Sequence, residues 1–451
     1  MPQTPVAVII LAAGMGTRMK SARPKVLHPV GGLPLVGHVI AVAETLAPEK
    51  IAVVIGPEMD DLAQAVSPYP TAVQTDRLGT ADAFKAARHH FEDFHQGTIL
   101  VLLGDTAFLD PAALAALTEK RDEGNAVVVL GIEPHDPGSY GRMIVDADTG
   151  ELREIVEVAG RDDVRSVGLC NTGVMAFDAS LIWDLVDQIG NDNPKGEFYL
   201  TDIVAVARKA GHRCAHIVTD SFQGIDSRIG LAQAEVSWQD SARRAAMEGG
   251  ATLLDPATTY FSFDAVIGRD VTISQNVVIG PGVTIADNVR IEPFCHLEHC
   301  VIEEDAVIGP FARLRGGTKV GEGAKIGTFV ESKNGTFGKG SKTPHLSYVG
   351  DAEVGAGANV GAGVITCNYD GVLKHKTIIG DGAFVGSNSS LVAPVTIGAR
   401  ALIGAGSVIS KDVAPDAIAT TRAPQKEIPG AATKRRERLQ KIKDTRNGHK
   451  G

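Results

Sequence analysis

A six-residue period of aliphatic side chains runs through the second half of the chain, from Phe263 to about Ser410. Neither an amphipathic helix nor an alternating strand repeats every six residues, whereas a triangular parallel β-solenoid with three short strands per turn does. The period comprises three runs: Ile267, Ile273, Ile279, Ile285, Ile291 and Leu297; Ile302, Ile308, Leu314, Val320 and Ile326; and Ile379, Val385, Leu391, Ile397, Ile403 and Ile409. The change of phase between runs predicts a slip near Cys300 and an insertion near residues 332–345.

The first half of the chain alternates buried-strand patterns with helical patterns. We predict strands at Val6–Leu11, Ile51–Ile55, Ile99–Leu103 and Ala126–Gly131, and helices at Leu35–Leu46 and Thr80–Phe94. This alternation is typical of an α/β, Rossmann-like domain with a mainly parallel sheet, in which ligands bind at the carboxyl ends of the strands. We therefore expect this domain at 1–228, a linker helix at 229–249, the solenoid domain at 250–430 and a tail at 431–451.

Composition narrows the possible partners. The 451 residues carry a net charge of −10, which argues against a nucleic-acid-binding protein, because such proteins need a basic surface to neutralise phosphates. No stretch approaches eighteen apolar residues and no basic segment precedes an apolar run at the N-terminus, so we expect no membrane span and a cytoplasmic location. The basic residues 431–451 predict a disordered, solvated tail, with an anion- or partner-binding role as the alternative.

The five cysteines are scattered and form no CxxC pair, so we expect no disulfide framework. The segment Cys295-His296-Leu297-Glu298-His299-Cys300 invites a zinc interpretation, because thiolates and imidazoles are zinc ligands. It lies within the six-residue period, however, where Cys295 takes a position that valines occupy in earlier turns. Buried structural thiols and surface histidines are therefore the favoured interpretation.

The first predicted strand runs into a glycine-rich segment that ends at Met19. Gly14 and Gly16 let backbone N–H groups approach a phosphate closely, and Arg18 and Lys25 supply two cations beside it. Met19 replaces the third glycine of a dinucleotide fingerprint, and the segment also lacks the lysine of an ATPase phosphate loop. A nucleoside triphosphate whose leaving group needs neutralising fits better. Asp105, at the end of a buried strand, suggests a magnesium ligand, although it could merely cap a turn.

The order of further motifs resembles that of the sugar-nucleotidyltransferase family. These motifs are Gln74 with Leu78-Gly79-Thr80, Tyr140-Gly141-Arg142, Ile155-Val156-Glu157 and Asn171-Thr172-Gly173. Taken with the solenoid, residues 5–428 resemble the bifunctional GlmU family, which joins an N-acetylglucosamine-1-phosphate uridylyltransferase to a glucosamine-1-phosphate acetyltransferase. The resemblance implies that the solenoid is a left-handed parallel β-helix of hexapeptide repeats.

The resemblance also assigns roles in the first domain. It implies that Arg18 and Lys25 are catalytic, that Asp105 and Asp226 bind Mg²⁺, and that the UTP and sugar ligands are Leu11, Ala12, Ala13, Gly14, Lys25, Gln74, Gly79, Thr80, Leu103, Gly104, Asp105, Gly141, Glu157, Asn171 and Asp226. Two positions depart from the family, which often has Tyr where Leu103 stands and Asn where Asp226 stands. Because a carboxylate is a harder ligand than an amide, we expect Asp226 to preserve magnesium binding.

Charged and polar residues gather where the six-residue period is interrupted, and a purely structural coil has no need of them. His345 is the available general base for acetyl transfer to an amine. The resemblance implies that glucosamine-1-phosphate is bound by Arg315, Lys333, Tyr348, Asn359 and Lys374. It further implies that acetyl-CoA is bound by Ala362, Asn368, Tyr369, Ser387, Ala405 and Arg422.

The implied function is a two-step synthesis of UDP-N-acetylglucosamine, a precursor of peptidoglycan and lipopolysaccharide, from glucosamine-1-phosphate, acetyl-CoA and UTP. Flat coil faces and sites between neighbouring coils favour a homotrimer, and the segment beyond Gln425 is a candidate to cover a neighbouring subunit. Two alternatives remain: a nucleotidyltransferase whose solenoid is only structural or allosteric, and a non-enzymatic regulatory subunit. The set of His345, Asn359, Asn368 and Lys374 speaks against the first, and Asp105 with Arg18 and Lys25 against the second.

Overall fold

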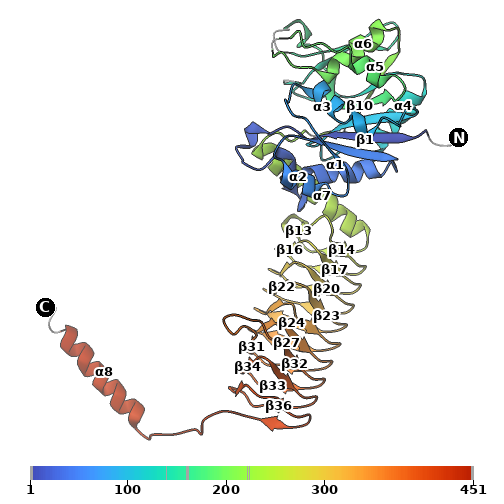
Figure 1. Cartoon of the computed structure of the whole chain (residues 1–451). Coiled ribbons are helices and arrows are strands. Elements are labelled where there is room, and N and C mark those ends of the chain that lie inside the picture. Colours follow the sequence, from blue (N-terminus) through green and yellow to red (C-terminus); the bar gives the residue numbers. More distant parts are fainter. Residues whose placement is uncertain are drawn as a thin grey trace. The chain divides into compact units, whose positions relative to one another are not determined.

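The chain forms two compact units in a computed structural model that describes residues 4–138, 140–158, 162–193, 195–220, 222 and 224–447 (Figure 1). The first unit extends to Ala245 and includes Phe261–Phe263, and the second comprises Ala246–Tyr260 and the residues from Asp264 onward. Helix α7 (Arg228–Glu248) spans the division, so most of the predicted linker helix belongs to the first unit. No described helix is long and apolar enough to cross a membrane.

The first unit is built on a mixed sheet of nine strands. Its central order is β11-β7-β10-β6-β1-β4-β5, in which only β10 runs antiparallel to its neighbours. The strands are β1 (Val6–Leu11), β4 (Lys50–Ile55), β5 (Thr71–Val73), β6 (Thr98–Leu103), β7 (Val127–Ile132), β8 (Arg142–Val145), β9 (Leu152–Val156), β10 (Cys170–Asp178) and β11 (Cys214–Val218). A small ribbon pairs β2 (Pro29–Val30) with β3 (Leu33–Pro34). The four predicted strands are therefore confirmed.

Helices cover both faces of this sheet, because alternate residues of β1 point to opposite sides. Ala7 and Ile9 pack into the core beneath α3 (Thr80–Ala86), α5 (Ile182–Val186) and α6 (Ile203–Lys209). Val8 and Ile10 pack into the core beneath α1 (Leu35–Glu44), α2 (Asp60–Ala65) and α4 (Pro111–Asp122). The helix predicted at Thr80–Phe94 ends at Ala86, and a 3₁₀ turn at Arg88–His90 then brings Phe91 and Phe94 into the first core.

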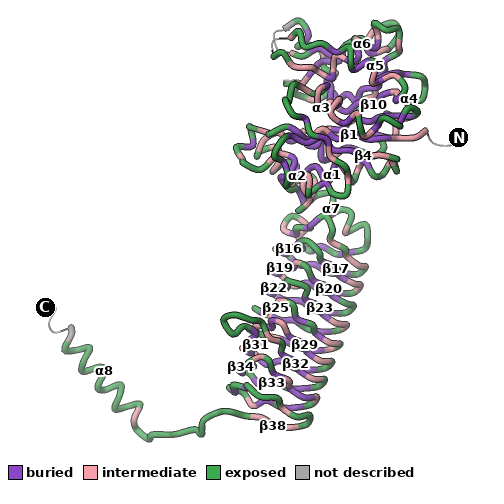
Figure 2. Tube along the Cα trace, in the orientation of Figure 1, coloured by how far each residue is buried: buried purple, intermediate pink, exposed green. Residues whose placement is uncertain are grey.

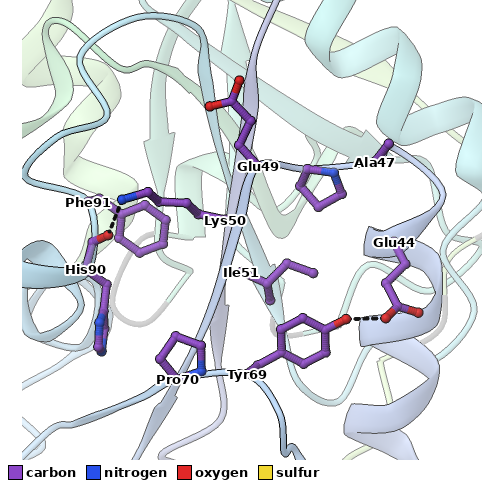
Figure 3. Close-up of a pocket in the computed structure, with 10 residues that line it drawn as sticks. Glu44, Ala47, Glu49, Lys50, Ile51, Tyr69, Pro70, His90 and Phe91 are labelled. Carbon is purple, nitrogen blue, oxygen red and sulfur yellow. Dashed lines mark hydrogen bonds between the residues drawn. The ribbon is translucent and has the colours of Figure 1, made fainter.

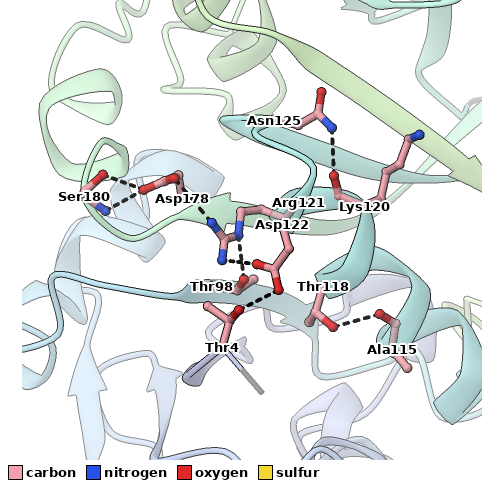
Figure 4. Close-up of polar contacts among 10 residues, drawn as sticks. All are labelled: Thr4, Thr98, Ala115, Thr118, Lys120, Arg121, Asp122, Asn125, Asp178 and Ser180. Atoms are coloured by element: carbon pink, nitrogen blue, oxygen red, sulfur yellow. Dashed lines mark hydrogen bonds and ion pairs between the residues drawn. The ribbon is translucent and has the colours of Figure 1, made fainter. Parts of the chain in front are cut away.

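A buried guanidinium ties α4 to the sheet. Arg121 donates from Nε to the hydroxyl of Thr98 on β6 at 2.7 Å, and its other nitrogens reach Asp178 on β10 and Asp122 (Figure 4). Asp122 in turn accepts a 2.6 Å hydrogen bond from Thr4. These groups lie where β6 begins, so this network stabilises the edge of the sheet opposite to the carboxyl end of β6.

The second unit is a left-handed parallel β-helix whose strands form three sheets. The first sheet contains β12 (Thr252–Leu253), β15 (Thr272–Ile273), β18 (Arg290–Ile291), β21 (Val307–Ile308), β24 (Lys325–Thr328), β27 (Lys342–His345), β30 (Asn359–Val360), β33 (Phe384–Val385), β36 (Leu402–Ile403) and β38 (Ile418–Ala419). The second contains β13 (Thr259–Phe261), β16 (Val277–Ile279), β19 (His296–Leu297), β22 (Arg313–Arg315), β25 (Glu331–Lys333), β28 (Tyr348–Gly350), β31 (Ile365–Cys367), β34 (Ser390–Val392) and β37 (Val408–Ile409). The third contains β14 (Val266–Ile267), β17 (Val283–Ile285), β20 (Cys300–Ile302), β23 (Thr318–Val320), β26 (Thr336–Phe337), β29 (Ala352–Val354), β32 (Thr377–Ile379) and β35 (Val395–Ile397).

The strand register confirms the slip near Cys300 and corrects the predicted insertion. Ile285 pairs with Ile302, one residue short of the eighteen that separate Ile273 from Ile291. The coil then continues without an insertion at 332–345, and buried positions recur along it (Figure 2). Ser332 and Thr343 fill fully buried inward positions, which a search for aliphatic residues misses. The true excursion is the loop 368–376, which lengthens the turn that ends at β34.

Two further predictions have a clear outcome. The thiols of Cys295 and Cys300 are buried, whereas His296 and His299 are exposed, so these side chains do not converge on one ion. Burial raises the pKa of Cys295 to about 11 and that of Cys300 to about 12.

The prediction of a disordered tail at 431–451 is wrong in one respect, because Ala431–Asn447 forms a helix, α8. Its Ala, Lys, Arg, Glu and Gln residues are strong helix formers. Most of α8 is exposed to solvent.

Candidate active sites

Two carboxylates meet at the carboxyl edge of the first sheet. Asp105 follows β6, and Asp226 precedes α7. The Ser227 hydroxyl caps the first turn of α7 by accepting a 3.1 Å hydrogen bond from Gly230 N–H. The two segments are joined because Ile225 N–H donates to Asp105 O at 3.2 Å. We call Asp105 and Asp226 the acidic pair.

Each member of the acidic pair contacts a cation from residues 11–28, to which we extend the name glycine-rich segment. Lys25 Nζ pairs with Asp105, and Arg18 pairs with Asp226. The Lys25 and Asp105 side chains are only 17% and 20% exposed, against 72% and 50% for Arg18 and Asp226. The inner ion pair is therefore poorly screened, whereas the outer pair is a weak surface contact.

The acidic pair fits a magnesium ion. The described residues contain no group of three or more His, Cys, Asp or Glu side chains that could hold a metal. Mg²⁺ is commonly bound by one or two carboxylates and completes its shell with water and substrate phosphates. Tyr140 interacts electrostatically with both carboxylates. Burial raises the pKa of Tyr140, and the charges of Asp226 and then Asp105 raise this pKa further. The donor set is thus two carboxylates beside the glycine-rich segment.

The glycine-rich segment is open where a ligand must approach and tight where it must hold its shape. A Cβ on Gly14 would meet no atom within 4 Å. Gly16 has φ +65°, and a Cβ there would lie 2.4 Å from Lys25 Cβ. Upstream, Leu11 O accepts from Gly104 N–H at 2.9 Å, which brings the predicted ligands Leu11, Ala12, Ala13, Leu103 and Gly104 to the same edge.

The predicted uracil-binding residues form one rigid group. Gln74 Nε2 donates to Gly79 O at 2.9 Å and to Asp82 Oδ2 at 2.8 Å. Gly79 has φ +115°, and a Cβ there would lie 2.5 Å from Phe198 O. The hydroxyl of Thr80 accepts from Leu200 N–H at 2.9 Å. Asp82 was not predicted, although it orients the Gln74 amide.

The predicted sugar-binding residues also converge. Asn171 N–H donates to Gly141 O at 2.8 Å, and a Cβ on Gly141 would lie 3.4 Å from the Glu157 carboxylate. Desolvation raises the pKa of Glu157. The charge of Lys195 acts to lower this pKa, and the charge of Asp202 raises it further. Gly141, Glu157 and Asn171 therefore form one group: Gly141 precedes β8, Glu157 follows β9, and Asn171 lies in β10.

Two cavities lie on different edges of the first unit. One of about 620 Å³ is lined by Met15, Ala22 and Pro24 of the glycine-rich segment together with residues that follow β4 and β5. The other, of about 580 Å³, lies where β4 and β5 begin, between Glu44, Lys50 and Tyr69 (Figure 3). Neither cavity is lined by a predicted site residue. The first is lined by Met15, Pro24 and Thr75, the sequence neighbours of Gly14, Lys25 and Gln74, so it is the better candidate for a nucleotide.

In the β-helix, His345 shares one corner with most of the predicted acetyl-CoA ligands. Gly363 N–H donates to His345 O, Asn388 N–H to Ala362 O, and Gly406 N–H to Ser387 O, so successive turns stack at this corner. The Arg422 guanidinium folds back to within 3.3 Å of where a Gly404 Cβ would lie, next to Ala405. We call the set His345, Ala362, Ser387 and Ala405 the corner row.

Three cations lie together on the second sheet and its loop. Arg315 is in register with Lys333, and the neighbouring Lys374 lowers the pKa of Lys333, with a smaller effect from Arg315. We call Arg315, Lys333 and Lys374 the cation cluster. Arg315 already forms a 2.8 Å ion pair with Glu331. Lys333 and Lys374 repel each other, and like charges held this close favour the binding of an anion such as a phosphate.

Tyr348 and Asp351 complete this region. The Tyr348 ring covers Gly350, where a Cβ would lie 2.4 Å from the Tyr348 hydroxyl. Asp351 accepts from Asn334 at 2.8 Å and from Asn368 at 2.5 Å. Burial acts to raise the pKa of Asp351, but these two hydrogen bonds and the charges of Lys374 and Lys333 lower it overall. Sequence reasoning missed Gly350 and Asp351, because neither the close contact nor the shared hydrogen bonds leave a local pattern.

Of two further predicted ligands, Asn359 lies apart from this region and Tyr369 lies beside Lys374. Asn359 points outward from β30 on the first sheet, where it pairs with Lys342, whereas the cation cluster belongs to the second sheet and its loop. Tyr369 lies in the loop 368–376, where it bridges to Lys374 and is 60% exposed. Within one chain, Asn359 therefore does not join Arg315, Lys333, Tyr348 and Lys374.

Comparison with protein families agrees with this architecture. The MobA-like NTP transferase domain matches residues 8–167, and the bacterial transferase hexapeptide model matches residues 264–299, 299–331 and 376–411. The fold and the two charged centres thus define a two-domain transferase that combines a nucleotidyltransferase with a hexapeptide-repeat acyltransferase.

Full-length relatives place the chain more closely. "Bifunctional protein GlmU" of Paramagnetospirillum magneticum is 52% identical over 437 residues, covering 96% of this chain and 97% of the relative. The proteins of the same name from Rhodospirillum rubrum and Paracoccus denitrificans are 50% and 48% identical, and cover 97% and 98% of this chain and 99% and 100% of their own lengths. The chain belongs to the bifunctional GlmU family, and it is an enzyme of UDP-N-acetylglucosamine synthesis with uridylyltransferase and acetyltransferase activities.

Proposed function

We propose that the acidic pair and the glycine-rich segment carry uridylyl transfer, and that the corner row and the cation cluster carry acetyl transfer. The observation that supports this assignment is the presence of two separate charged centres, one in each unit. Lys25 and Arg18 contact the acidic pair, whereas Arg315, Lys333 and Lys374 gather on the β-helix. Each centre suits one phosphorylated substrate.

In the uridylyl reaction, an oxygen of N-acetylglucosamine-1-phosphate attacks the α-phosphorus of UTP, and the bond to the β-phosphate breaks to release pyrophosphate. Mg²⁺ held by Asp105 and Asp226 would supply positive charge to the phosphate oxygens. Lys25 and Arg18 neutralise the leaving pyrophosphate, and the Gln74, Gly79 and Thr80 group orients the base. Positioning and charge neutralisation then account for most of the rate.

In the acetyl reaction, the amine of glucosamine-1-phosphate attacks the thioester carbonyl of acetyl-CoA, and the carbon–sulfur bond breaks to release the thiol. His345 accepts the amine proton and returns one to the departing sulfur. Its side chain is exposed at the corner of β27, while its backbone carbonyl is held by Ser347 Oγ at 2.8 Å. The cation cluster binds the sugar phosphate, and the corner row with Asn368, Tyr369 and Arg422 holds coenzyme A.

A homotrimer completes the acetyltransferase site in this proposal. Phe294, Phe311 and Phe329 stack along the corner that continues into His345, with ring centroids 4.8 and 4.9 Å apart. These rings are 44–55% exposed, and Leu346 next to them is 61% exposed. We call them the aromatic ridge. An apolar stripe of this kind marks an interface, and a second copy can supply the Asn359 that a single chain places on another face.

The trimer is tested by Phe311→Glu, which puts a charge at the centre of the aromatic ridge. We expect sedimentation to show mostly smaller species and acetyl transfer to fall, while uridylyl transfer persists. Val266→Glu, at a site of similar exposure (57%) on the third sheet, is the matched control. A Phe311→Glu protein that sediments as the wild type does would contradict the interface.

The pairing of sites with reactions is tested by following thiol and pyrophosphate release separately. We expect His345→Ala to abolish thiol release and to leave uridylyl transfer to supplied N-acetylglucosamine-1-phosphate intact. Asp105→Ala should do the reverse, and chelation of Mg²⁺ should match Asp105→Ala. Loss of both activities in either variant would contradict the assignment of separate sites.

We also propose that the enzyme is cytoplasmic, because its five cysteines are all free thiols, as is usual in a reducing compartment.

A further inference from the structure

The start of α7 makes a contact that the catalytic assignment does not use. Arg228, the first residue of α7, lies two residues beyond Asp226. Its Nε donates to Met19 O at 3.2 Å, and its Nη1 lies 3.3 Å from His28 Nδ1. One guanidinium therefore joins α7 to two points of the glycine-rich segment, which are nine residues apart in sequence.

Each of these two points sits beside a catalytic cation. Met19 ends the 3₁₀ turn Thr17–Met19, whose middle residue is Arg18, and its side chain is buried. His28 follows the 3₁₀ turn that begins at Lys25, and His28 N–H donates to Lys25 O at 3.1 Å. The contacts of Arg228 therefore control where both turns lie relative to Asp226.

The donor and the acceptor in the contact between Arg228 and His28 are fixed by chemistry. Because an arginine only donates, His28 Nδ1 must accept, which places the imidazole proton on Nε2. His28 is 4% exposed, and burial together with the charges of Arg228 and Arg23 lowers its pKa, in keeping with a neutral ring. His28 Nε2 has no hydrogen-bond partner among the described residues, so Arg228 is the group that orients this ring.

We propose that Arg228 is a positioning residue for uridylyl transfer: together with His28 it latches the glycine-rich segment to the start of α7, next to Asp226. Arg228 touches neither the acidic pair nor its cations, and it acts by holding Arg18 and Lys25 at a set spacing from Asp226 and Asp105. This inference rests on the uridylyltransferase assignment above. It adds a residue that ties the metal-binding carboxylates to the phosphate-binding cations.

The test is a set of variants assayed as full-length protein. Arg228→Gln should lower kcat for uridylyl transfer about tenfold and raise the Mg²⁺ concentration needed for half-maximal rate, because the cations and carboxylates are no longer held in one geometry. Arg228→Lys, which can still donate to Met19 O, should recover part of the rate. His28→Asn, which keeps an acceptor, should stay close to wild type, whereas His28→Val should resemble Arg228→Gln.

Three controls make the result specific. Arg244→Gln makes the same change at an exposed site on α7 and should leave both activities unchanged. Acetyl transfer should be unchanged in every variant, which shows that the chain has folded. Wild-type kcat and Mg²⁺ dependence in both Arg228→Gln and His28→Val would overturn the proposal, as would equal losses in Arg228→Gln and Arg228→Lys with no rescue by His28→Asn.

Hydrogen exchange separates this proposal from the function on which it rests. Faster amide exchange in residues 17–28 of Arg228→Gln, with unchanged exchange in the β-helix, is the expected result whatever the enzyme's rate. If wild-type protein transfers no uridylyl group, the proposed function fails while the latch is still judged by exchange. If exchange in residues 17–28 does not change, the latch fails even though the enzyme is active.

Discussion

The α/β unit and the β-helix assemble their candidate sites in opposite ways. In the α/β unit, Lys25 contacts Asp105 across 80 residues of chain, and Arg18 contacts Asp226 across 208. In the β-helix, His345, Ala362, Ser387 and Ala405 recur once per turn and are stacked by the strand register itself. The first site depends on ion pairs between distant segments, whereas the second depends on a repeat that places similar positions side by side.

This difference predicts how each site responds to change. A substitution at the carboxyl edge of the α/β sheet removes a member of an ion pair, and its consequences spread to every segment that meets there. A substitution on the coil alters one step of a regular stack, and neighbouring turns keep their places. Four experiments probe this contrast, beginning with the largest expected effect.

Lys25→Met should lower uridylyl transfer by about 10²–10³-fold, because removal of one group that stabilises transition-state charge typically costs this much. It also leaves the 20%-exposed Asp105 without its cation. Pyrophosphate release is the measurement, and acetyl transfer should be unchanged. Lys20→Met, which removes an exposed cation of the same segment, should keep nearly full activity. Similar losses in the two variants would mean that net charge matters rather than the buried ion pair.

Gly350→Ala should lower acetyl transfer about tenfold, because the new Cβ meets the Tyr348 hydroxyl at 2.4 Å and must push the ring away from the cation cluster. The effect should appear mainly in KM for glucosamine-1-phosphate. Gly190→Ala, where a Cβ meets no atom within 4 Å, should change neither reaction. Wild-type kinetics in Gly350→Ala would exclude Tyr348 from the sugar site.

Raising the pH should weaken glucosamine-1-phosphate binding at a lower pH than it would if Lys333 had the pKa of an ordinary lysine. The pKa of Lys333 is lowered by Lys374 and then by Arg315, so Lys333 loses its proton as the pH rises through this lowered value, and the site loses positive charge. We expect KM to rise a few-fold on the alkaline side. Lys333→Arg, which stays charged, should flatten that rise, and an unchanged profile would show that Lys333 does not face the phosphate.

Thr343→Val should stabilise the β-helix by about 1 kcal/mol, because a buried hydroxyl with no partner costs about that much and valine has nearly the same shape. Thr343 is fully buried, and its hydroxyl has no hydrogen-bond partner among the described residues. Thr366→Val is the opposite case, since the Thr366 hydroxyl accepts from Gly350 N–H at 2.8 Å and donates to Gly350 O at 3.0 Å. That variant should be destabilised, and denaturant midpoints that move the same way for both would contradict the argument.

Sequence reasoning predicted much of the fold because burial repeats with a period. The six-residue pattern identified the coil and its slip at Cys300, and the alternation of apolar runs identified the four strands of the α/β unit. It failed where inward positions are polar: because Ser332 and Thr343 are not aliphatic, they suggested an insertion, whereas the coil continues there with a second one-residue slip between Ser332 and Phe337. It also treated the basic segment as disordered, although the helix propensity of its residues favours α8.

For the candidate sites, residue types and motif order predicted the chemistry of the side chains. They did not predict which distant side chains contact one another. The cations, carboxylates and His345 are visible in the sequence, and so is the concentration of polar residues near the loop 368–376. The tertiary structure decides that Arg18 contacts Asp226, that the Tyr348 ring lies over Gly350 and that Arg228 contacts Met19. A local pattern records whether a residue is buried. Which distant segment it meets depends on how the whole chain packs, since a charge in sequence carries no label for its partner.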